Sequence, residues 1–286
     1  MDLAATSGMN AVADKNNFLV VYPEQPPSAN LLGCWNWFET KHQSRGSGEP
    51  SLLAAIIEQI RWFYNIDSNR IYVTGISAGA AMAVILAATY PDVFAAAGVV
   101  AGLEFGAASG LSAGLSAMKN GGPDPNRQGT AAFQAMRGGL SAKPKARMPL
   151  IVFHGTADPY VNPVNAEQVI MQWARTNHCL DGNQGSKDVL AAVGELVGGS
   201  VSDGYSFQKY SYKDGAGQLL MEKWLIDGLG HAWPGSPVSA PFADPKGPKA
   251  SEEMWRFFCE TTSVAPEYGA KSRFWDRLTG LLHGGH

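Results

Sequence analysis

Residues 70–82 limit what this chain can fold into more than any other stretch. They read Arg-Ile-Tyr-Val-Thr, then Gly-Ile-Ser-Ala-Gly, then Ala-Ala-Met. This order is typical of a strand that enters a tight turn with a helix directly behind it, which is the pattern of a nucleophile elbow. We expect Ser77 to lie at the tip of this turn as a nucleophile. We also expect Gly75 and Gly79 to be required, because a Cβ at either position would clash in so tight a turn.

The same five-residue pattern occurs a second time, at residues 110–114 (Gly-Leu-Ser-Ala-Gly). No strand leads directly into that second copy, and Gly-Gly-Pro at 121–123 ends any helix soon after it. Ser77, by contrast, has an apolar strand before it and a long helical run after it. We therefore expect Ser77 to be the nucleophile and Ser112 to be an ordinary loop or short-helix serine.

The alternation of strands and helices predicts one mostly parallel sheet with helices on both faces. Strands are expected at residues 18–22, 70–74, 94–100, 149–154, 205–212 and 219–226, and helices at 50–63, 78–89, 165–176 and 250–261. Residues 24–50, 102–122 and 180–204 are expected to be loops or irregular segments. We expect one catalytic domain over residues 1–262. The tail at 263–286 is expected to hold a short amphipathic helix.

Composition is that of a globular protein, with 45% hydrophobic and 16% charged residues in 286. The net charge of −3 has no long run of one sign behind it, so we expect no nucleic-acid partner. The longest apolar run, at 78–88, is too short to span a bilayer. Residues 1–6 lack the basic start and apolar core of a signal peptide. The three cysteines form no C-x-x-C pair, and we expect no metal site.

A serine hydroxyl needs a base to take its proton and a carboxylate to orient that base. In α/β-hydrolases the three groups occur in the order Ser, Asp, His, with each one in a loop after a strand. Asp158 follows the strand at 149–154, and His231 follows the strand at 219–226 in a glycine-rich loop. The sequence therefore predicts a triad of Ser77, Asp158 and His231. This chemistry requires no cofactor, and we expect none.

The other histidines and aspartates fit structural positions better. His154 lies at a strand end, where we expect a structural histidine with its hydrogen bonds satisfied. The remaining candidates lie in polar stretches, turns, a helix end or the terminus; they are His42, His178, Asp203, Asp214, Asp227, His283 and His286.

Acyl transfer also requires donors that stabilise the oxyanion. One should be the backbone N–H of Ala78, the residue after the nucleophile. The second normally comes from a loop near a His-Gly pair. The sequence N-terminal to Ser77 contains no such loop.

Four segments together resemble the poly(3-hydroxybutyrate) depolymerase family of esterases, which is related to feruloyl and acetylxylan esterases. They are residues 18–25 (Phe-Leu-Val-Val-Tyr-Pro-Glu-Gln), 34–38 (Cys-Trp-Asn-Trp-Phe), 75–82 and 230–235 (Gly-His-Ala-Trp-Pro-Gly). The resemblance covers about residues 8–260. It implies an α/β-hydrolase fold and a secreted serine esterase with the triad named above. We expect Trp35, Trp37 and Trp233 to contact the ester substrate.

The resemblance also implies that a segment is missing before Gly8, so that the fold is N-terminally truncated. That segment would supply a strand between 18–22 and 70–74, the second oxyanion donor and a disulfide partner for Cys34. Pairing of Cys179 with Cys259 stays open. Without the strand, 18–22 and 70–74 are expected either to keep unpaired backbone groups or to pair directly.

The favoured function is hydrolysis of short-chain polyhydroxyalkanoate or its oligomers, outside the cell as the resemblance implies. One alternative is a feruloyl or acetylxylan esterase. A second alternative is a hydrolase-like protein with impaired catalysis. The sequence does not determine the oligomeric state.

Overall fold

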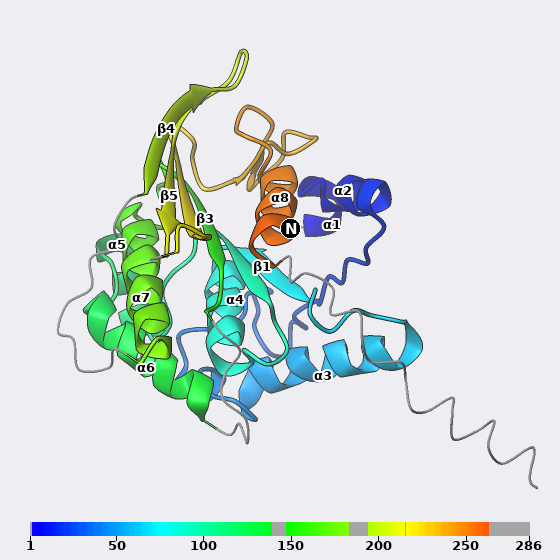
Figure 1. Ribbon diagram of the computed structural model, residues 1–286, viewed down its shortest axis with the longest axis vertical. Coiled ribbons are helices and arrows are strands. Elements are labelled where there is room, and N and C mark those ends of the chain that lie inside the picture. Colours follow the sequence, from blue (N-terminus) through cyan, green and yellow to red (C-terminus); the bar gives the residue numbers. More distant parts are fainter. Residues whose placement is uncertain (1, 139–146, 183–193, 215, 263–286) are drawn as a thin grey trace, which may run out of the picture.

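The computed structural model describes residues 2–138, 147–182, 194–214 and 216–262 of the chain (Figure 1). At its centre lies a six-stranded sheet with the strand order β1-β2-β3-β6-β5-β4. The strands are β1 (Tyr72–Ile76), β2 (Ala96–Val100), β3 (Leu150–Gly155), β4 (Glu195–Ser200), β5 (Ser206–Lys213) and β6 (Leu219–Ile226). β1, β2, β3 and β6 run parallel, whereas β5 and β4 continue the sheet antiparallel. The predicted mostly parallel sheet is therefore confirmed.

Helices cover both faces of this sheet, as the sequence predicts (Figure 1). α4, α6 and α7 pack on one face, and α8 packs on the other with α2 beside it. These helices are α2 (Met9–Asn16), α4 (Ala78–Thr89), α6 (Pro125–Arg137), α7 (Val164–Leu180) and α8 (Ala250–Thr262). The remaining elements are α1 (Leu3–Thr6), α3 (Gly48–Phe63), α5 (Leu111–Asn120), a 3-10 turn at Thr40–His42, and the short strands β7 (Trp233–Pro234) and β8 (Ala243–Asp244).

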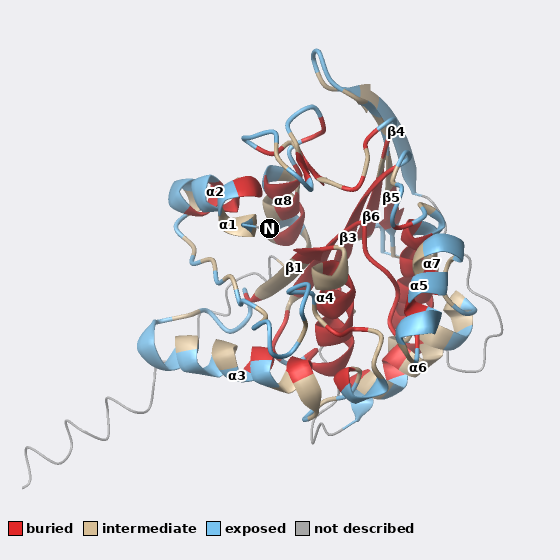
Figure 2. Cartoon of the chain, turned by 180° about the vertical axis from the view of Figure 1, so that it is seen from behind, coloured by how far each residue is buried: buried red, intermediate tan, exposed pale blue. Residues whose placement is uncertain are grey.

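Two hydrophobic cores lie on the two faces of the sheet. In β3, Leu150 and Val152 belong to the core beside α4, while Ile151 and Phe153 belong to the core beside α8. A strand that is buried on both faces reads as a continuous apolar run, which is why β3 was predictable. α4 is buried from Ala80 to Thr89 on all its sides, and Figure 2 shows it within the interior of the molecule. The helix behind Ser77 is therefore fixed in the core.

β1, the strand that leads to Ser77, lies at the edge of the sheet. The strand predicted at residues 18–22 is absent, and this prediction is wrong: the segment forms no regular structure. A strand needs a hydrogen-bonded neighbour, and no strand of the described residues lies beside this segment. Phe18 stacks instead on Trp255 of α8, with ring centroids 4.4 Å apart. Of the two expected outcomes, direct pairing of 18–22 with β1 does not occur.

A groove of about 1540 Å³ opens beside β1, with residues 18–25 among those that line it. One side of the β1 backbone faces β2, and the other side faces this groove. Ile71 O accepts from Ala95 N, and Ser77 N donates to Val100 O, so odd-numbered residues direct their backbone groups to β2. Since these directions alternate along a strand, Tyr72, Thr74 and Ile76 direct theirs toward the groove.

Two other segments differ from the sequence prediction, and a third lies outside the described residues. Residues 195–200, expected in a loop, form β4, whose two glycines and mostly exposed side chains hide the strand pattern. Residues 102–122, expected to be irregular, contain α5, and Ser112 lies in its first turn. The amphipathic helix predicted at 263–286 falls outside the described residues.

Cys179 is buried and free, so it is not paired with Cys259, and Cys34 is also free. No described helix is both long and apolar enough to cross a membrane.

The free edge of β1 predicts an alternating pattern of amide hydrogen exchange. We expect the amides of Tyr72, Thr74 and Ile76 to exchange at least about tenfold faster than those of Val73, Gly75 and Ser77, because only the second set is hydrogen-bonded within the sheet. Exchange followed residue by residue by NMR measures this difference. Equal protection of the two sets would mean that another segment or chain pairs with the edge.

Candidate active site

Ser77 lies in the sharp turn between β1 and α4 that the sequence predicts. Its backbone has φ 57° and ψ −123°, a conformation that is costly for any residue with a side chain. Two hydrogen bonds hold it there: Ser77 N donates to Val100 O of β2 at 2.9 Å, and Ala81 N of α4 donates to Ser77 O at 3.0 Å. The sheet and the buried helix together therefore hold the strained residue in place.

The two glycines of the elbow are not equivalent. A Cβ at Gly75 would lie 2.4 Å from the backbone carbonyl carbon and oxygen of Gly79, so strand and helix can approach this closely only with glycine there. A Cβ at Gly79 would meet nothing nearer than Trp35 Cδ1, at 4.0 Å. The expectation that a Cβ would clash at both glycines is confirmed for Gly75. It is wrong for Gly79, which faces the groove.

Asp158 and His231 lie in contact although 73 residues separate them in the sequence. Asp158 follows β3 and His231 follows β6, and these two strands are neighbours in the sheet. His231 Nδ1 is 2.6 Å from Asp158 Oδ2, and the two side chains are 4% and 0% exposed. The structure thus brings these two predicted residues together in a buried hydrogen bond.

Asp158 is held as a carboxylate. Its Oδ1 accepts hydrogen bonds from the backbone N–H groups of Tyr160 and Val161, both at 2.9 Å. Burial alone would raise the pKa of Asp158, but the hydrogen bonds from His231, Val161 and Tyr160 outweigh it and place the pKa below its ordinary value. Because a carboxylate only accepts, the proton at their contact is on His231 Nδ1, which leaves His231 Nε2 free to act as a base.

Ser77 and His231 both line the groove beside β1. Within the described residues the Ser77 hydroxyl has no hydrogen bond to His231; such bonds are often long without substrate and tighten when it binds. The His231 ring packs edge to face on Tyr160 and Phe242, with centroids 5.4 Å and 5.8 Å away. Neither aromatic residue was predicted from the sequence. Tyr160 could have been found from its position two residues after Asp158, whereas nothing local marks Phe242.

Ala78 is the first residue of α4, so its N–H has no acceptor within the helix. The amino end of a helix also carries partial positive charge, which favours an anion next to it. Both features suit the oxyanion donor that the sequence predicts at this position.

The three predicted substrate-binding tryptophans lie in different surroundings. Trp35 and Trp233 line the groove, although Trp233 is almost fully buried and its indole N–H has no partner in the part of the chain that the structure describes. Trp37 is not among the groove-lining residues; it is a core side chain that packs edge to face on Phe38 at 5.7 Å.

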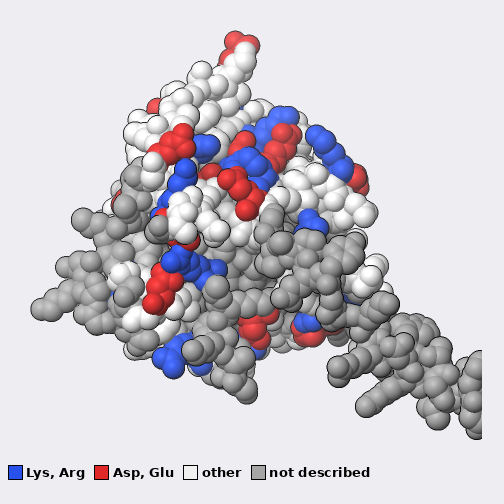
Figure 3. Space-filling view, viewed as in Figure 1, with Lys and Arg blue, Asp and Glu red and all other residues white. Residues whose placement is uncertain are grey.

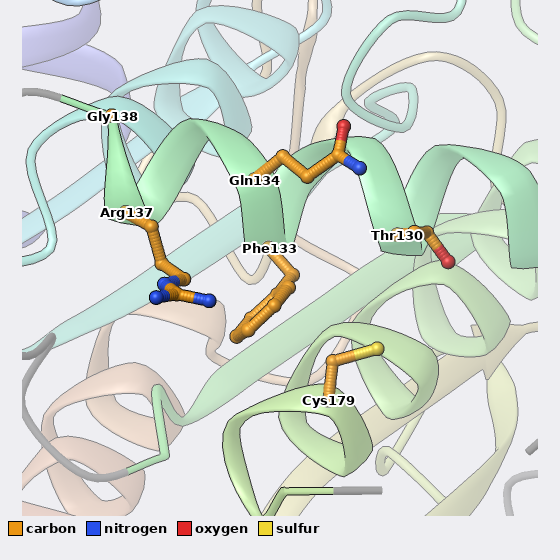
Figure 4. Close-up of a pocket in the computed structure, with 6 residues that line it drawn as sticks. All are labelled: Thr130, Phe133, Gln134, Arg137, Gly138 and Cys179. Atoms are coloured by element: carbon orange, nitrogen blue, oxygen red, sulfur yellow. The ribbon is translucent and has the colours of Figure 1, made fainter. Parts of the chain in front are cut away.

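A second hollow, of about 430 Å³, lies between α6 and α7, and none of the three triad residues lines it. Figure 4 shows Phe133 of α6 and Cys179 of α7 among the residues that line it.

The described residues contain no group of three or more His, Cys, Asp or Glu side chains that could hold a metal ion. On the face drawn in Figure 3, the described Lys and Arg side chains lie among Asp and Glu rather than in an area of one sign.

The sequence matches the model of the esterase PHB depolymerase family over residues 2–193. The chain belongs to this family. It is 33% identical over 231 residues to poly(3-hydroxyalkanoate) depolymerase C of Paucimonas lemoignei, a match that covers 81% of this chain and 51% of that protein. It is 34% identical over 171 residues to acetylxylan esterase A of Emericella nidulans, covering 57% and 53% of the two chains. The chain therefore spans about half the length of these relatives.

Among solved structures, the acetyl xylan esterase from Aspergillus awamori superposes with a TM-score of 0.64 at 23% identity. The superposition covers 88% of this chain and 81% of that one. This likeness establishes the α/β-hydrolase fold for the family member described here.

The unequal roles of the two elbow glycines can be tested by a matched pair of variants. We expect Gly75→Ala to lower the melting temperature by several degrees or to prevent folding, because its Cβ overlaps the backbone of α4. Gly79→Ala should leave the melting temperature nearly unchanged, because its Cβ has space. Thermal unfolding followed by circular dichroism measures both, and equal destabilisation would contradict the geometry of the elbow.

Proposed function

We propose that this chain is a serine esterase that hydrolyses carboxylic esters through an acyl-enzyme. The observation that carries the proposal is the 2.6 Å contact of Asp158 with His231, which lines the same groove as the strained Ser77. A serine in a strained turn and a buried carboxylate–histidine pair, all at one edge of the sheet, are the components of a Ser-His-Asp triad. Membership of an esterase family supports the same reaction.

In this proposal His231 Nε2 accepts the Ser77 proton while Ser77 Oγ attacks the ester carbonyl carbon. The Ala78 N–H and the amino end of α4 stabilise the resulting oxyanion. Protonated His231 then gives its proton to the leaving alcohol, which breaks the ester bond and leaves the acyl group on Ser77. Water, deprotonated by His231, releases the acid and restores the serine. Asp158 stabilises the imidazolium form of His231 in both halves of the reaction.

The substrate that we propose is a short-chain polyhydroxyalkanoate or its oligomers, acted on outside the cell. Its support is the match to a poly(3-hydroxyalkanoate) depolymerase over four fifths of this chain. The aromatic side chains of Trp35, Tyr160 and Phe242 near the triad would suit an apolar polyester chain. The acetylxylan esterases among the relatives support an acetylated polysaccharide as the alternative, and a feruloylated polysaccharide is the further alternative that the sequence resemblance implies. Release of acid from polyhydroxybutyrate film, compared with acetylxylan and methyl ferulate, distinguishes them.

The alternative of impaired catalysis has one observation in its favour. β1, which positions Ser77, has backbone groups on its groove side that find no partner within residues 2–138, 147–182, 194–214 and 216–262. A site built on such an edge is expected to be less rigid than one inside a sheet.

Labelling with a fluorophosphonate tests whether Ser77 is activated. We expect the wild-type protein to be labelled, Ser77→Ala to lose the label, and Ser112→Ala to keep it, because Ser77 lines the groove with His231 and Ser112 does not. Mass spectrometry of the labelled peptide locates the modification. Absence of label on the folded wild-type protein would favour the impaired alternative over the esterase.

Replacing Asp158 tests the orienting role of the carboxylate. We expect Asp158→Asn to lower kcat for p-nitrophenyl butyrate by roughly 10³- to 10⁴-fold, because an amide can hold His231 in the tautomer that cannot accept the Ser77 proton. Exposed Asp227, in a turn nearby, serves as the matched control, and Asp227→Asn should leave kcat unchanged. A kcat for Asp158→Asn within tenfold of the wild type would reject this role.

A further inference from the structure

A second histidine contacts the orienting carboxylate. His154 lies in β3, one residue before its end, and is 1% exposed. Its Nε2 atom is 2.9 Å from the backbone carbonyl oxygen of Val161 and 3.5 Å from Asp158 Oδ2. The sequence predicts a structural histidine at this position, and the proposed triad does not use it.

The surroundings of His154 determine its tautomer. The Val161 carbonyl can only accept a hydrogen bond, so the proton must be on His154 Nε2. The other ring nitrogen, Nδ1, is buried and has no partner among the described residues. With the proton on Nε2, Nδ1 of the neutral ring is therefore bare. Burial also lowers the pKa of His154, so its neutral form is favoured. Asp158 and His231 are the titratable groups whose charges act on it.

The contact with Val161 closes a short loop around the carboxylate. Val161 donates its N–H to Asp158 Oδ1, and its carbonyl accepts from His154. The other end of the turn is tied to the loop that carries His231, because Ala157 N donates to Leu229 O at 3.0 Å. The turn at residues 157–161 is thus fixed at one end to the His231 loop and at the other to β3.

We propose that His154 is a positioning residue for the Asp158–His231 pair. Its Nε2–H anchors the Val161 carbonyl, which holds the Tyr160 and Val161 N–H groups against Asp158 Oδ1 and leaves Oδ2 directed at His231. The same N–H places a positive dipole end near Oδ2 without competing for it, because 3.5 Å is longer than a good hydrogen bond. Asp158 therefore lies between two histidines of opposite tautomer, one that anchors its turn and one that acts as base. The inference rests on the proposed esterase function.

Two substitutions separate the anchoring N–H from simple packing. His154→Gln carries an amide N–H at a similar distance from the backbone and can keep the bond to Val161, whereas His154→Leu cannot donate. With p-nitrophenyl butyrate we expect His154→Leu to lower kcat about 10- to 100-fold at unchanged KM, since a shift of the orienting group affects chemistry rather than binding. We expect His154→Gln to recover most of the loss. Wild-type kcat in His154→Leu, or equal losses in both variants, would overturn the proposal.

NMR provides a readout that does not depend on turnover. In protein with ¹⁵N-labelled histidine we expect wild-type His154 to show a protonated Nε2 and a bare Nδ1, and His231 to show the reverse. The low-field proton of His231 Nδ1–H should persist in His154→Gln and weaken or shift in His154→Leu. A protonated Nδ1 on His154 in the wild type would overturn the proposal even if His154→Leu fails to fold. If the expected tautomers are found but no ester is hydrolysed, the proposed function fails and the anchoring role stands.

Discussion

Parallel pairing of β1, β2, β3 and β6 is the constraint on which the rest of the structure depends. In parallel strands all carboxyl ends lie at the same edge of the sheet, so the loops that follow them meet there. Ser77 follows β1, Asp158 follows β3 and His231 follows β6. The direct pairing of β3 with β6 brings the carboxylate and the imidazole within 2.6 Å. β2 lies between β1 and β3 in the sheet, and Ser77 at the end of β1 lines the same groove as His231.

Among the described strands, only β2 pairs with β1, so the strained conformation of Ser77 is held from one side of its strand. Gly75 allows α4 to pack against the strand without a Cβ between them, and the Ser77 N–H is held by β2. On the other side of β1 lies the groove, with the backbone groups of Tyr72, Thr74 and Ile76 directed into it. Ser77, the proposed nucleophile, therefore lies between a buried helix and the edge strand of the sheet. That combination is what makes both the esterase and the impaired alternative reasonable to test.

Most of the site could be predicted from sequence because its signals are local. The strand-turn-helix around Ser77, and the loops of Asp158 and His231 after apolar strands, are patterns of a few residues each. The contribution of His154 could not be predicted in the same way, because it depends on the carbonyl of Val161 turning back onto β3. The aromatic contact of Phe242 with His231 likewise depends on a loop fold that no local pattern indicates.

The sequence by itself determined the class of the sheet, the elbow and the identities of the candidate nucleophile, carboxylate and base, because hydrophobic period and turn residues act over short distances. Only the tertiary structure decided which elements find partners. The apolar residues 18–22 have the composition of a strand, but no strand of the described residues lies beside them, so they form none. Gly75 and Gly79 belong to the same motif, yet a Cβ at Gly79 would have space around it, while a Cβ at Gly75 would overlap the backbone of α4. Strand pairing and close packing join residues far apart in the chain, and these long-range contacts cannot be read from local pattern.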